Sequence, residues 1–166
     1  MPITLRDVTP DDERFLREVY AGTRAYELAM VPWNEEQREV FLRTQFDAQH
    51  SHYHSQYPDA KFQLIVSDGE PVGRLYVLRE VEAIRILDIT VLPPYRNKGI
   101  GGALIRVLVD EAEKNKQVVT VWIEHFNPSQ KFFQRFGFSV IGDDGYNYHF
   151  EHAPQISADS TSASRR

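Results

Sequence analysis

The chain has 166 residues, of which 42% are hydrophobic and 26% charged, and this length and composition fit one globular domain with its own core. Its formal net charge of −5 argues against a nucleic-acid-binding protein, because phosphate contacts dominate the affinity of such proteins. It contains no cysteine, which excludes disulfides, thiolate metal sites and a cysteine nucleophile, and no apolar run reaches the ~18 residues of a membrane helix.

A first strand and a first helix are predicted at the N-terminal end. Residues 2–8 alternate in side-chain character, as in a half-buried strand. Thr9, Pro10 and the two acids that follow are typical of a helix start. Apolar and aromatic residues then recur at helical spacing, at Phe15, Leu16, Val19 and Tyr20.

A second helix is predicted from Asn34 to about Gln56. Asn34, with Gln37 three residues later, forms the capping-box pattern, in which each side chain bonds the backbone amide of the other residue. We expect the core-facing stripe of this helix to consist of residues at helical spacing, namely Val40, Phe41, Thr44 and Ala48.

The remaining segments predict strands and two further helices. In chain order they are a strand at 62–66, a turn at 68–71, strands at 72–78 and 84–92, a helix to about 115, a strand at 118–126, a short helix at 127–137 and a hairpin of 138–141 with 146–151. Antiparallel strands come first and a strand-helix-strand crossover follows. We therefore predict an α/β (mixed α+β) fold, with a mixed, mostly antiparallel central sheet and helices on both faces. One domain at 1–152 and a flexible polar tail at 153–166 complete this prediction.

The segment LPPYRNKGIGGALI at 92–105 is basic at its front and glycine-rich in its centre. It lacks the Gly-Lys-Ser/Thr of a Walker A loop, and Leu104 occupies the third glycine position of a dinucleotide-binding fingerprint. What remains is Arg-x-x-Gly-x-Gly between a strand and a helix. This pattern predicts an anion site, because the first amides of a helix have no partner and carry the positive end of its dipole. A tight turn that only packs the helix on the sheet is the alternative.

Two segments together resemble the GNAT superfamily of acetyl-CoA-dependent N-acyltransferases. ILDITVLPPYRNKGIGGALI is similar to the family's central strand, acyl-CoA loop and helix. WIEHFNPSQKFFQRFGF is similar to the family's following strand, asparagine, short helix and closing Phe-Gly-Phe. The order of the predicted elements also fits up to about His152. The resemblance implies a GNAT fold, whose two middle strands splay apart to admit acetyl-CoA as the cosubstrate.

The resemblance also implies which residues bind the cofactor. Backbone amides from Arg96 to Gly101 would hold the CoA pyrophosphate, and the strand at Ile89–Val91 would pair with the pantetheine arm. Asn127 matches a family residue that contacts CoA, and it also suits a helix cap before Pro128, two roles that are compatible. The implied cofactor-binding residues are Ile89, Thr90, Val91, Arg96, Asn97, Lys98, Gly99, Ile100, Gly101, Gly102 and Asn127.

The implied reaction is the direct transfer of an acetyl group to a primary amine in a ternary complex. The lack of cysteine fits this reaction, because no acetyl-cysteine intermediate can form. A free strand amide near Ile89 or Thr90 is the candidate donor to the oxyanion. Phe133 departs from the family pattern, since many members carry a tyrosine there that protonates the leaving thiolate. The alternatives are another tyrosine (Tyr76, Tyr146 or Tyr148), water, or a thiolate that leaves unaided.

Two carboxylates are the candidate catalytic residues. Asp88 interrupts an apolar strand, where an acid is costly unless it is paired or functional. Glu124 ends the next strand, close to the expected splay. The alternative for Asp88 is an ion pair with Arg74 or Arg85, and the alternative for Glu124 is ordinary solvation at a strand end. Phe133 also leaves open a non-catalytic acyl-CoA-binding module, and a nucleotide-phosphate module is a third possibility.

The acceptor is expected to contact the helices at 21–57 and the hairpin at 143–149. Side chains there that suit a small cationic amine or a protein amine, although packing and solvation also explain most of them, are Tyr20, Tyr26, Trp33, Tyr53, Tyr57, Glu27, Glu35 and Glu36. His50 and His54 are spaced like a zinc pair, but no known metal motif surrounds them, so no metal is expected. We expect a cytoplasmic protein with no nucleic-acid or membrane partner, and a homodimer is compatible with the fold.

Overall fold

The computed structural model describes residues 2–155, so the predicted tail lies outside the described residues from position 156 onward. Over this range the chain forms a seven-stranded sheet in the order β1-β2-β3-β4-β5-β7-β6, which confirms the predicted mixed α/β fold. The elements in chain order are β1 (Ile3–Asp7), the 3-10 helix η1 (Pro10–Asp12), α1 (Glu13–Ala29), α2 (Glu35–Gln56), β2 (Lys61–Ser67), β3 (Glu70–Arg79), β4 (Ala83–Val91), the 3-10 helix η2 (Pro93–Tyr95), α3 (Ile100–Asn115), β5 (Val118–Glu124), α4 (Ser129–Arg135), β6 (Ser139–Asp143) and β7 (Asn147–His152).

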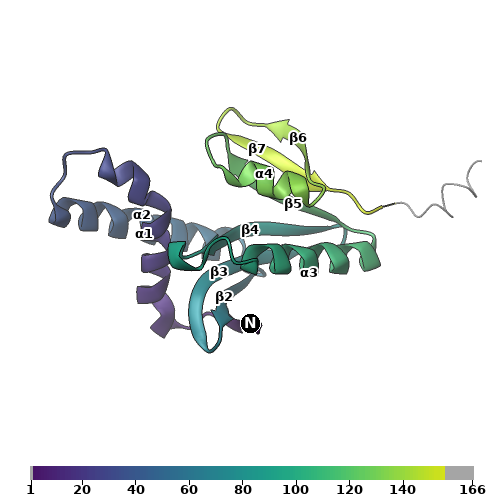
Figure 1. Cartoon of the computed structure of the whole chain (residues 1–166), viewed down its shortest axis with the longest axis horizontal. Coiled ribbons are helices and arrows are strands. Elements are labelled where there is room, and N and C mark those ends of the chain that lie inside the picture. Colours follow the sequence, from purple (N-terminus) through teal and green to yellow (C-terminus); the bar gives the residue numbers. More distant parts are fainter. Residues whose placement is uncertain (1, 156–166) are drawn as a thin grey trace, which may run out of the picture. The chain divides into compact units, whose positions relative to one another are not determined.

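The chain forms two compact units, and β4 and α3 each contribute residues to both. The first unit holds the described residues up to Leu78 together with Leu87–Gly101. The second unit holds Arg79–Ile86 together with the described residues from Gly102 onward. In Figure 1 the N-terminal helices of the first unit are purple and blue, and the C-terminal strands of the second unit are green and yellow. The single domain proposed for residues 1–152 stays a prediction.

The first unit combines the antiparallel strands β1, β2 and β3 with the helices α1 and α2. β1 pairs with β2, and β2 pairs with β3 through a bulge between Ile65 and Val66. Helices α1 and α2 contact each other and cross in Figure 1. The buried core of this unit joins residues from both helices and two strands, namely Leu16, Tyr20, Phe46, Leu64 and Tyr76.

Both N-terminal helices begin where the sequence predicts. Asp12 Oδ2 accepts a hydrogen bond from Thr9 N at 2.8 Å, and η1 then leads directly into α1. Asn34 Oδ1 accepts a bond from Gln37 N at 2.8 Å. Gln37 Oε1 in turn accepts one from Asn34 N at 2.9 Å. This reciprocal pair confirms the capping box at the start of α2.

The apolar stripe predicted for α2 is wrong. Its four members are exposed or only partly buried: Val40, Phe41, Thr44 and Ala48. The buried residue of α2 is Phe46, with Leu42 and Tyr53 packed against the same core. These three residues are four and seven positions apart, so they form a second row at helical spacing. The row with the larger aromatic rings is buried because it removes more apolar surface from water.

The paired residues of the predicted strand-helix-strand crossover lie in the second unit. β4 pairs in parallel with β5 from Ala83↔Val118 to Ile86↔Val121, and α3 connects the two strands. β5 pairs antiparallel with β7, and β7 pairs antiparallel with β6. Phe133 of α4 is buried and meets the ring of Phe138 edge-on, at 5.2 Å between centroids. Among the residues described, no helix has both the length and the apolar character needed to span a membrane.

Gly73 marks a close approach between β3 and β4. A Cβ atom at this position would overlap Thr90 O and lie 3.0 Å from Val91 Cα, so a side chain there would displace β4. Gly22 in α1 differs, because its Cβ would meet Pro93 Cδ at 3.5 Å, which is an ordinary contact. Only the first of these glycines is required by packing.

Replacing Gly73 with alanine is expected to lower the free energy of unfolding by about 1–3 kcal/mol, the range observed for overpacking. The matched control Gly22→Ala should leave stability unchanged or raise it by up to about 1 kcal/mol, because alanine forms helix better than glycine. Denaturant unfolding of both variants measures the two effects. Equal stability of the two variants would contradict the close approach of β3 and β4.

Candidate active site

A buried ion pair joins β3 to β4 in the first unit. The side chain of Arg74 is 2% exposed and that of Asp88 is 15% exposed. Arg74 donates from Nη2 to Asp88 Oδ2 at 2.8 Å and from Nε to Asp88 Oδ1 at 3.2 Å. Two parallel bonds of this kind make the pairing of arginine with a carboxylate both strong and directional. This is the ion pair that the sequence allowed as the alternative to a catalytic role for Asp88.

Three polar side chains complete the network around this pair. Thr90 Oγ1 donates to Asp88 Oδ1 at 2.6 Å, and the Tyr53 hydroxyl is shared between Leu87 O at 3.2 Å and Asp88 Oδ2 at 3.4 Å. Gln49 Oε1 accepts a hydrogen bond from Arg74 Nη2 at 2.8 Å. Each carboxylate oxygen of Asp88 therefore accepts two hydrogen bonds. An ionised carboxylate offers about four acceptor positions, so little capacity is left to take a proton from a substrate.

Burial and charge shift the pKa values of Tyr53 and Arg74. Burial raises the pKa of Tyr53 above its ordinary value, and the charge of Asp88 raises it further. Burial acts to lower the pKa of Arg74, but the charge and hydrogen bonds of Asp88 outweigh this effect and raise it. Near neutral pH the phenol is therefore protonated and the guanidinium charged. The hydrogen bonds from Arg74 hold Asp88 in place, and the segment Ile89–Val91 follows Asp88 directly along β4.

The predicted CoA loop leads from β4 into α3. Asn97 and Gly99 have φ angles of 61° and 84°, so the backbone passes twice through the left-handed region before α3 begins at Ile100. Nothing outside the neighbouring residues lies within 4 Å of a Cβ placed on Gly99. The first amides of a helix, here those of Ile100 and Gly101, lack intrahelical partners. The turn thus presents backbone donors on an open side, as an anion site requires.

The two basic side chains of this loop have different surroundings. Arg96 Nε donates to Val91 O at 2.8 Å, so its guanidinium bonds the end of β4. Lys98 is exposed, and its Nζ lies 5.9 Å from the centroid of the Tyr95 ring. Ile100 is buried and anchors the first turn of α3. Lys98 is therefore the basic side chain of the loop that is exposed and not hydrogen-bonded to β4.

Gly102 and Asn127 belong to the second unit. A Cβ atom on Gly102 would lie 3.1 Å from Phe136 Cζ, so this glycine leaves room for that ring against α3. Asn127 Oδ1 accepts a hydrogen bond from Ser129 N at 2.9 Å. The cap position of α4 is Pro128, and Asn127, one residue earlier, satisfies the first amide of the helix through this bond.

Glu124 and His125 lie at the end of β5. Glu124 is exposed, and its carboxylate makes no hydrogen bond or ion pair with another described residue. His125 Nε2 lies 2.7 Å from Asp143 Oδ1, and its ring is 4.1 Å from that of Tyr148. The amide of Gly145 and the bond to His125 hold the pKa of Asp143 below its usual range. Of the two predicted catalytic carboxylates, Glu124 is the one that is available to accept a proton.

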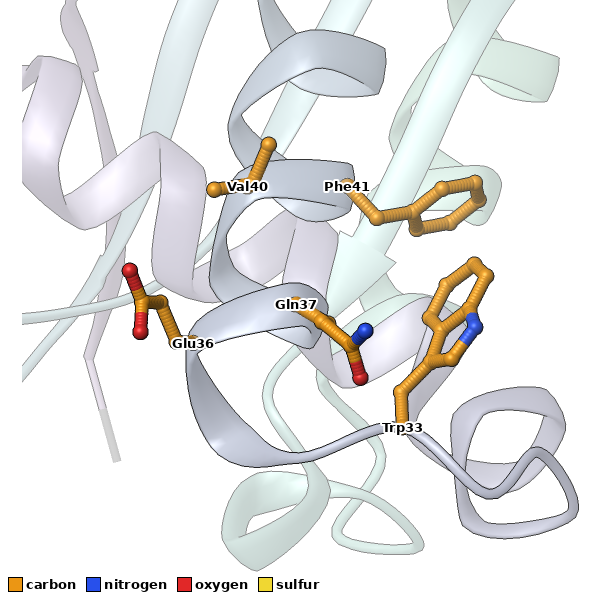
Figure 2. A pocket seen from close by; sticks show the side chains of 5 residues that line it. All are labelled: Trp33, Glu36, Gln37, Val40 and Phe41. Carbon is orange, nitrogen blue, oxygen red and sulfur yellow. The ribbon is translucent and has the colours of Figure 1, made fainter.

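The side chains predicted to line an acceptor pocket do not form one group. Tyr20 is buried in the core, Tyr53 belongs to the Asp88 network, and Tyr26 is 79% exposed. Five residues at the start of α2 line a shallow hollow, namely Trp33, Glu36, Gln37, Val40 and Phe41. Figure 2 shows the rings of Trp33 and Phe41 facing each other on one side of the helix and Glu36 on the other.

His50 and His54 have adjacent rings on α2, with 4.4 Å between their centroids. Within residues 2–155, no group of three or more potential metal ligands comes together. Burial and the neighbouring His50 hold the pKa of His54 below its ordinary value. The two side chains stack on Phe46 and Phe62, so they extend the aromatic packing of the first unit.

Two features, one in each unit, were not visible in the sequence. One is the part that Gln49 and Thr90 play around Asp88, which depends on the packing of α2 against the sheet. The other is the stacking of Trp122 on His149, with ring centroids 4.2 Å apart and planes inclined by 2°. Cross-strand pairs of this kind depend on the register of two strands that are far apart in the sequence. The aromatic content of both strands was the available signal.

Comparison with known proteins places this architecture in a family. The model of the acetyltransferase (GNAT) family matches residues 23–138. The PaiA N-acetyltransferase of Thermoplasma acidophilum, in complex with coenzyme A, is 21% identical, with a TM-score of 0.69 over 92% of this chain and 99% of that one. An acetyltransferase of Thermus thermophilus is 24% identical, with a TM-score of 0.63 over 91% and 96%. No curated protein matches the chain.

A third similar structure carries a substrate analogue. Arabidopsis thaliana Naa50, in complex with the bisubstrate analogue CoA-Ac-MVNAL, is 18% identical, with a TM-score of 0.59 over 92% of this chain and 99% of that one. At these identities the three structures show a shared fold. The family match covers more than half of the chain, so the chain belongs to the GNAT acetyltransferase family. It is accordingly an acyltransferase.

Replacing Arg74 with methionine is expected to lower the free energy of unfolding by about 3–5 kcal/mol, because it leaves the buried Asp88 carboxylate unpaired. The matched control Arg43→Met breaks an exposed pair with Glu39, 3.4 Å apart, and should cost at most about 1 kcal/mol. The double variant Arg74→Met/Asp88→Leu should recover part of the loss, since no charge is then left unpaired. Chemical denaturation measures all three, and equal losses for Arg74→Met and Arg43→Met would contradict the role of the pair.

Proposed function

We propose that this chain is an N-acetyltransferase that transfers the acetyl group of acetyl-CoA directly to a primary amine in a ternary complex. The observation that carries the proposal is the turn between β4 and α3, where Asn97 and Gly99 adopt left-handed conformations and lead into the first amides of α3, which have no intrahelical partner. The family match supports acyl transfer. The CoA-bound and bisubstrate-bound neighbours support acetyl-CoA and an amine as the two substrates.

We assign cofactor binding to the residues that the family pattern implies. The amides from Arg96 to Gly101 would hold the pyrophosphate, with Lys98 adding charge at the surface. Ile89–Val91 would pair with the pantetheine arm, in the part of β4 that follows the last residue paired with β5, Ile86. We propose that Asn127 adds a contact through its amide nitrogen, since its Oδ1 already accepts the bond from Ser129 N.

Proton transfer is assigned to Glu124. The amine must lose a proton as its nitrogen attacks the acetyl carbon, and an exposed, unpaired carboxylate can accept that proton directly or through water. A strand amide at Ile89 or Thr90 would stabilise the oxyanion until the carbon–sulfur bond breaks. Phe133 is buried against Phe138 and has no hydroxyl, so the departing thiolate would take its proton from water.

We propose a positioning role for Asp88 instead of a role as the base. Both of its oxygens are occupied by hydrogen bonds from Arg74, Thr90 and Tyr53. The carboxylate therefore fixes the start of the segment that would bind pantetheine. Substitution of Asp88 would impair cofactor binding and stability together, whereas loss of a general base would impair the chemical step alone.

The test is the release of CoA thiol from acetyl-CoA in the presence of pooled primary amines. We expect release with at least one pool, and a loss of about 10²–10⁴-fold in kcat for Glu124→Gln, the usual contribution of a general base. Glu82→Gln, an exposed glutamate in the β3–β4 turn, is the matched control and should retain full activity. No release with any small-molecule or peptide amine would contradict the proposal and would favour a non-catalytic acyl-CoA-binding module.

A further inference from the structure

An aromatic pair lies on the exposed side of β5 and β7 in the second unit. Trp122 of β5 is directly opposite His149 of β7, and their rings stack at 4.2 Å with planes only 2° apart. Trp122 is nevertheless 47% exposed. Because His149 covers one side of the indole, much of the exposed surface belongs to the rest of the ring, including its other face. A large aromatic ring held flat and half-open to solvent is a candidate contact surface for a ligand.

The neighbouring side chains on the same side of the strands are polar. Side chains alternate along β5, and Trp122 and Glu124 are exposed while Val121 and Ile123 are buried. Glu124 is directly opposite Asn147, so this pair lies next to the Trp122–His149 pair along the ladder. A carboxylate and a carboxamide therefore adjoin an open indole.

Exposed aromatic side chains continue beyond this point. The β5–β7 ladder ends at Glu124↔Asn147, and His125 N then bonds Tyr146 O at 3.0 Å. Phe126 and Tyr146, which follow and precede these strands, are 89% and 78% exposed. Exposed aromatic rings therefore lie on both sides of Glu124 along the chain, with Trp122 before it and Phe126 after it.

Two carboxylates, those of Glu124 and Glu151, and one guanidinium, that of Arg85, lie around the stacked pair, so the local charge favours a cation over an anion. Burial lowers the pKa of His149, an effect that nearby Arg85 adds to and that Glu151 opposes. The imidazole is therefore neutral near neutral pH and does not repel a positive charge. An indole face attracts cations through its quadrupole, and Glu124 adds a full negative charge beside it.

We infer that the face formed by Trp122, Glu124, Asn147 and His149 binds the acceptor, and that this acceptor is a primary ammonium ion attached to an apolar group. The ammonium would lie between the open indole face and the Glu124 carboxylate, with Asn147 accepting one of its hydrogen bonds. Glu124 would take one ammonium proton and so free the nitrogen lone pair for attack on the acetyl carbon. The second N–H proton would pass through water to the departing thiolate as the carbon–sulfur bond breaks. The apolar group would extend toward Phe126 and Tyr146. This inference rests on the proposed acetyltransferase function, since it assigns the second substrate of that reaction.

The hollow at the start of α2 is the competing location. It also combines aromatic rings with a carboxylate, that of Glu36. In Figure 2, however, Glu36 lies on the opposite side of the helix from Trp33 and Phe41. On β5, by contrast, Trp122 and Glu124 are two residues apart and lie on the same exposed face of the strand. The first test therefore distinguishes the two tryptophans.

The chain has two tryptophans, so each can be made the only one. Trp33→Phe leaves Trp122 as the reporter, and Trp122→Phe leaves Trp33. The probe is 2-phenylethylamine, and its uncharged counterpart is 2-phenylethanol. We expect the amine to change Trp122 emission saturably, with the alcohol binding at least tenfold more weakly and Trp33 emission unchanged. A response of Trp33 instead of Trp122, or equal binding of amine and alcohol, would overturn the inference.

Kinetics separate this inference from the proposed function. With any amine that is turned over, Trp122→Ala should raise KM at least tenfold with kcat changed less, and Trp122→Phe should restore most of the loss because it retains a ring. CoA affinity, measured by calorimetry, should be equal in all three proteins. Normal turnover with an unchanged KM in Trp122→Ala would overturn the binding face and leave the acetyltransferase function standing. Absence of CoA binding and thiol release in the unaltered chain would overturn the function itself, and the inference with it.

Discussion

The bidentate ion pair between Arg74 and Asp88 is the interaction on which the first unit depends most. A charged guanidinium that is 2% exposed is tolerated only with a carboxylate beside it, because desolvation of an unpaired charge costs several kcal/mol. The pair links β3 to β4, and Gln49 and Tyr53 connect it to α2. One buried charge pair therefore determines how a helix and two strands meet.

This constraint determines where the following segment begins. Strand β4 continues from Asp88 through Ile89–Val91, and Arg96 then bonds the carbonyl of Val91. The backbone turns through Asn97 and Gly99 into α3, whose first residue is buried. The proposed anion site is thus made of backbone that is held at both ends. An arrangement of this kind binds a phosphate group with little loss of conformational freedom.

Local sequence signals predicted local structure well, and packing decided the rest. The capping box at Asn34 and the bond from Asn127 to the start of α4 depend on residues close in the sequence, and both were predictable. The crossover through α3 was predictable from the order of strand, helix and strand along the chain. The buried face of α2 was not, because two apolar rows compete on that helix and only tertiary contacts choose Phe46 over Val40. The same holds for Asp88. The sequence shows that Asp88 is an acid in an apolar strand. Whether Asp88 acts as a base or forms an ion pair depends on the orientation of the Arg74 side chain, which only the structure shows. The stacking of Trp122 on His149 was likewise not predictable, because it depends on the register that places the two residues opposite each other.

Calorimetric titration of CoA into the full chain tests most directly whether the turn between β4 and α3 is a cofactor site. We expect saturable binding of one CoA per chain, with ATP and NAD binding far more weakly, because the turn lacks the Walker A and dinucleotide patterns. Gly99→Val should weaken CoA binding, because a β-branched residue is strained at a φ of 84°. Absence of binding by CoA, or equal affinity for CoA and ATP, would contradict the assignment of residues 96–101 to the CoA pyrophosphate.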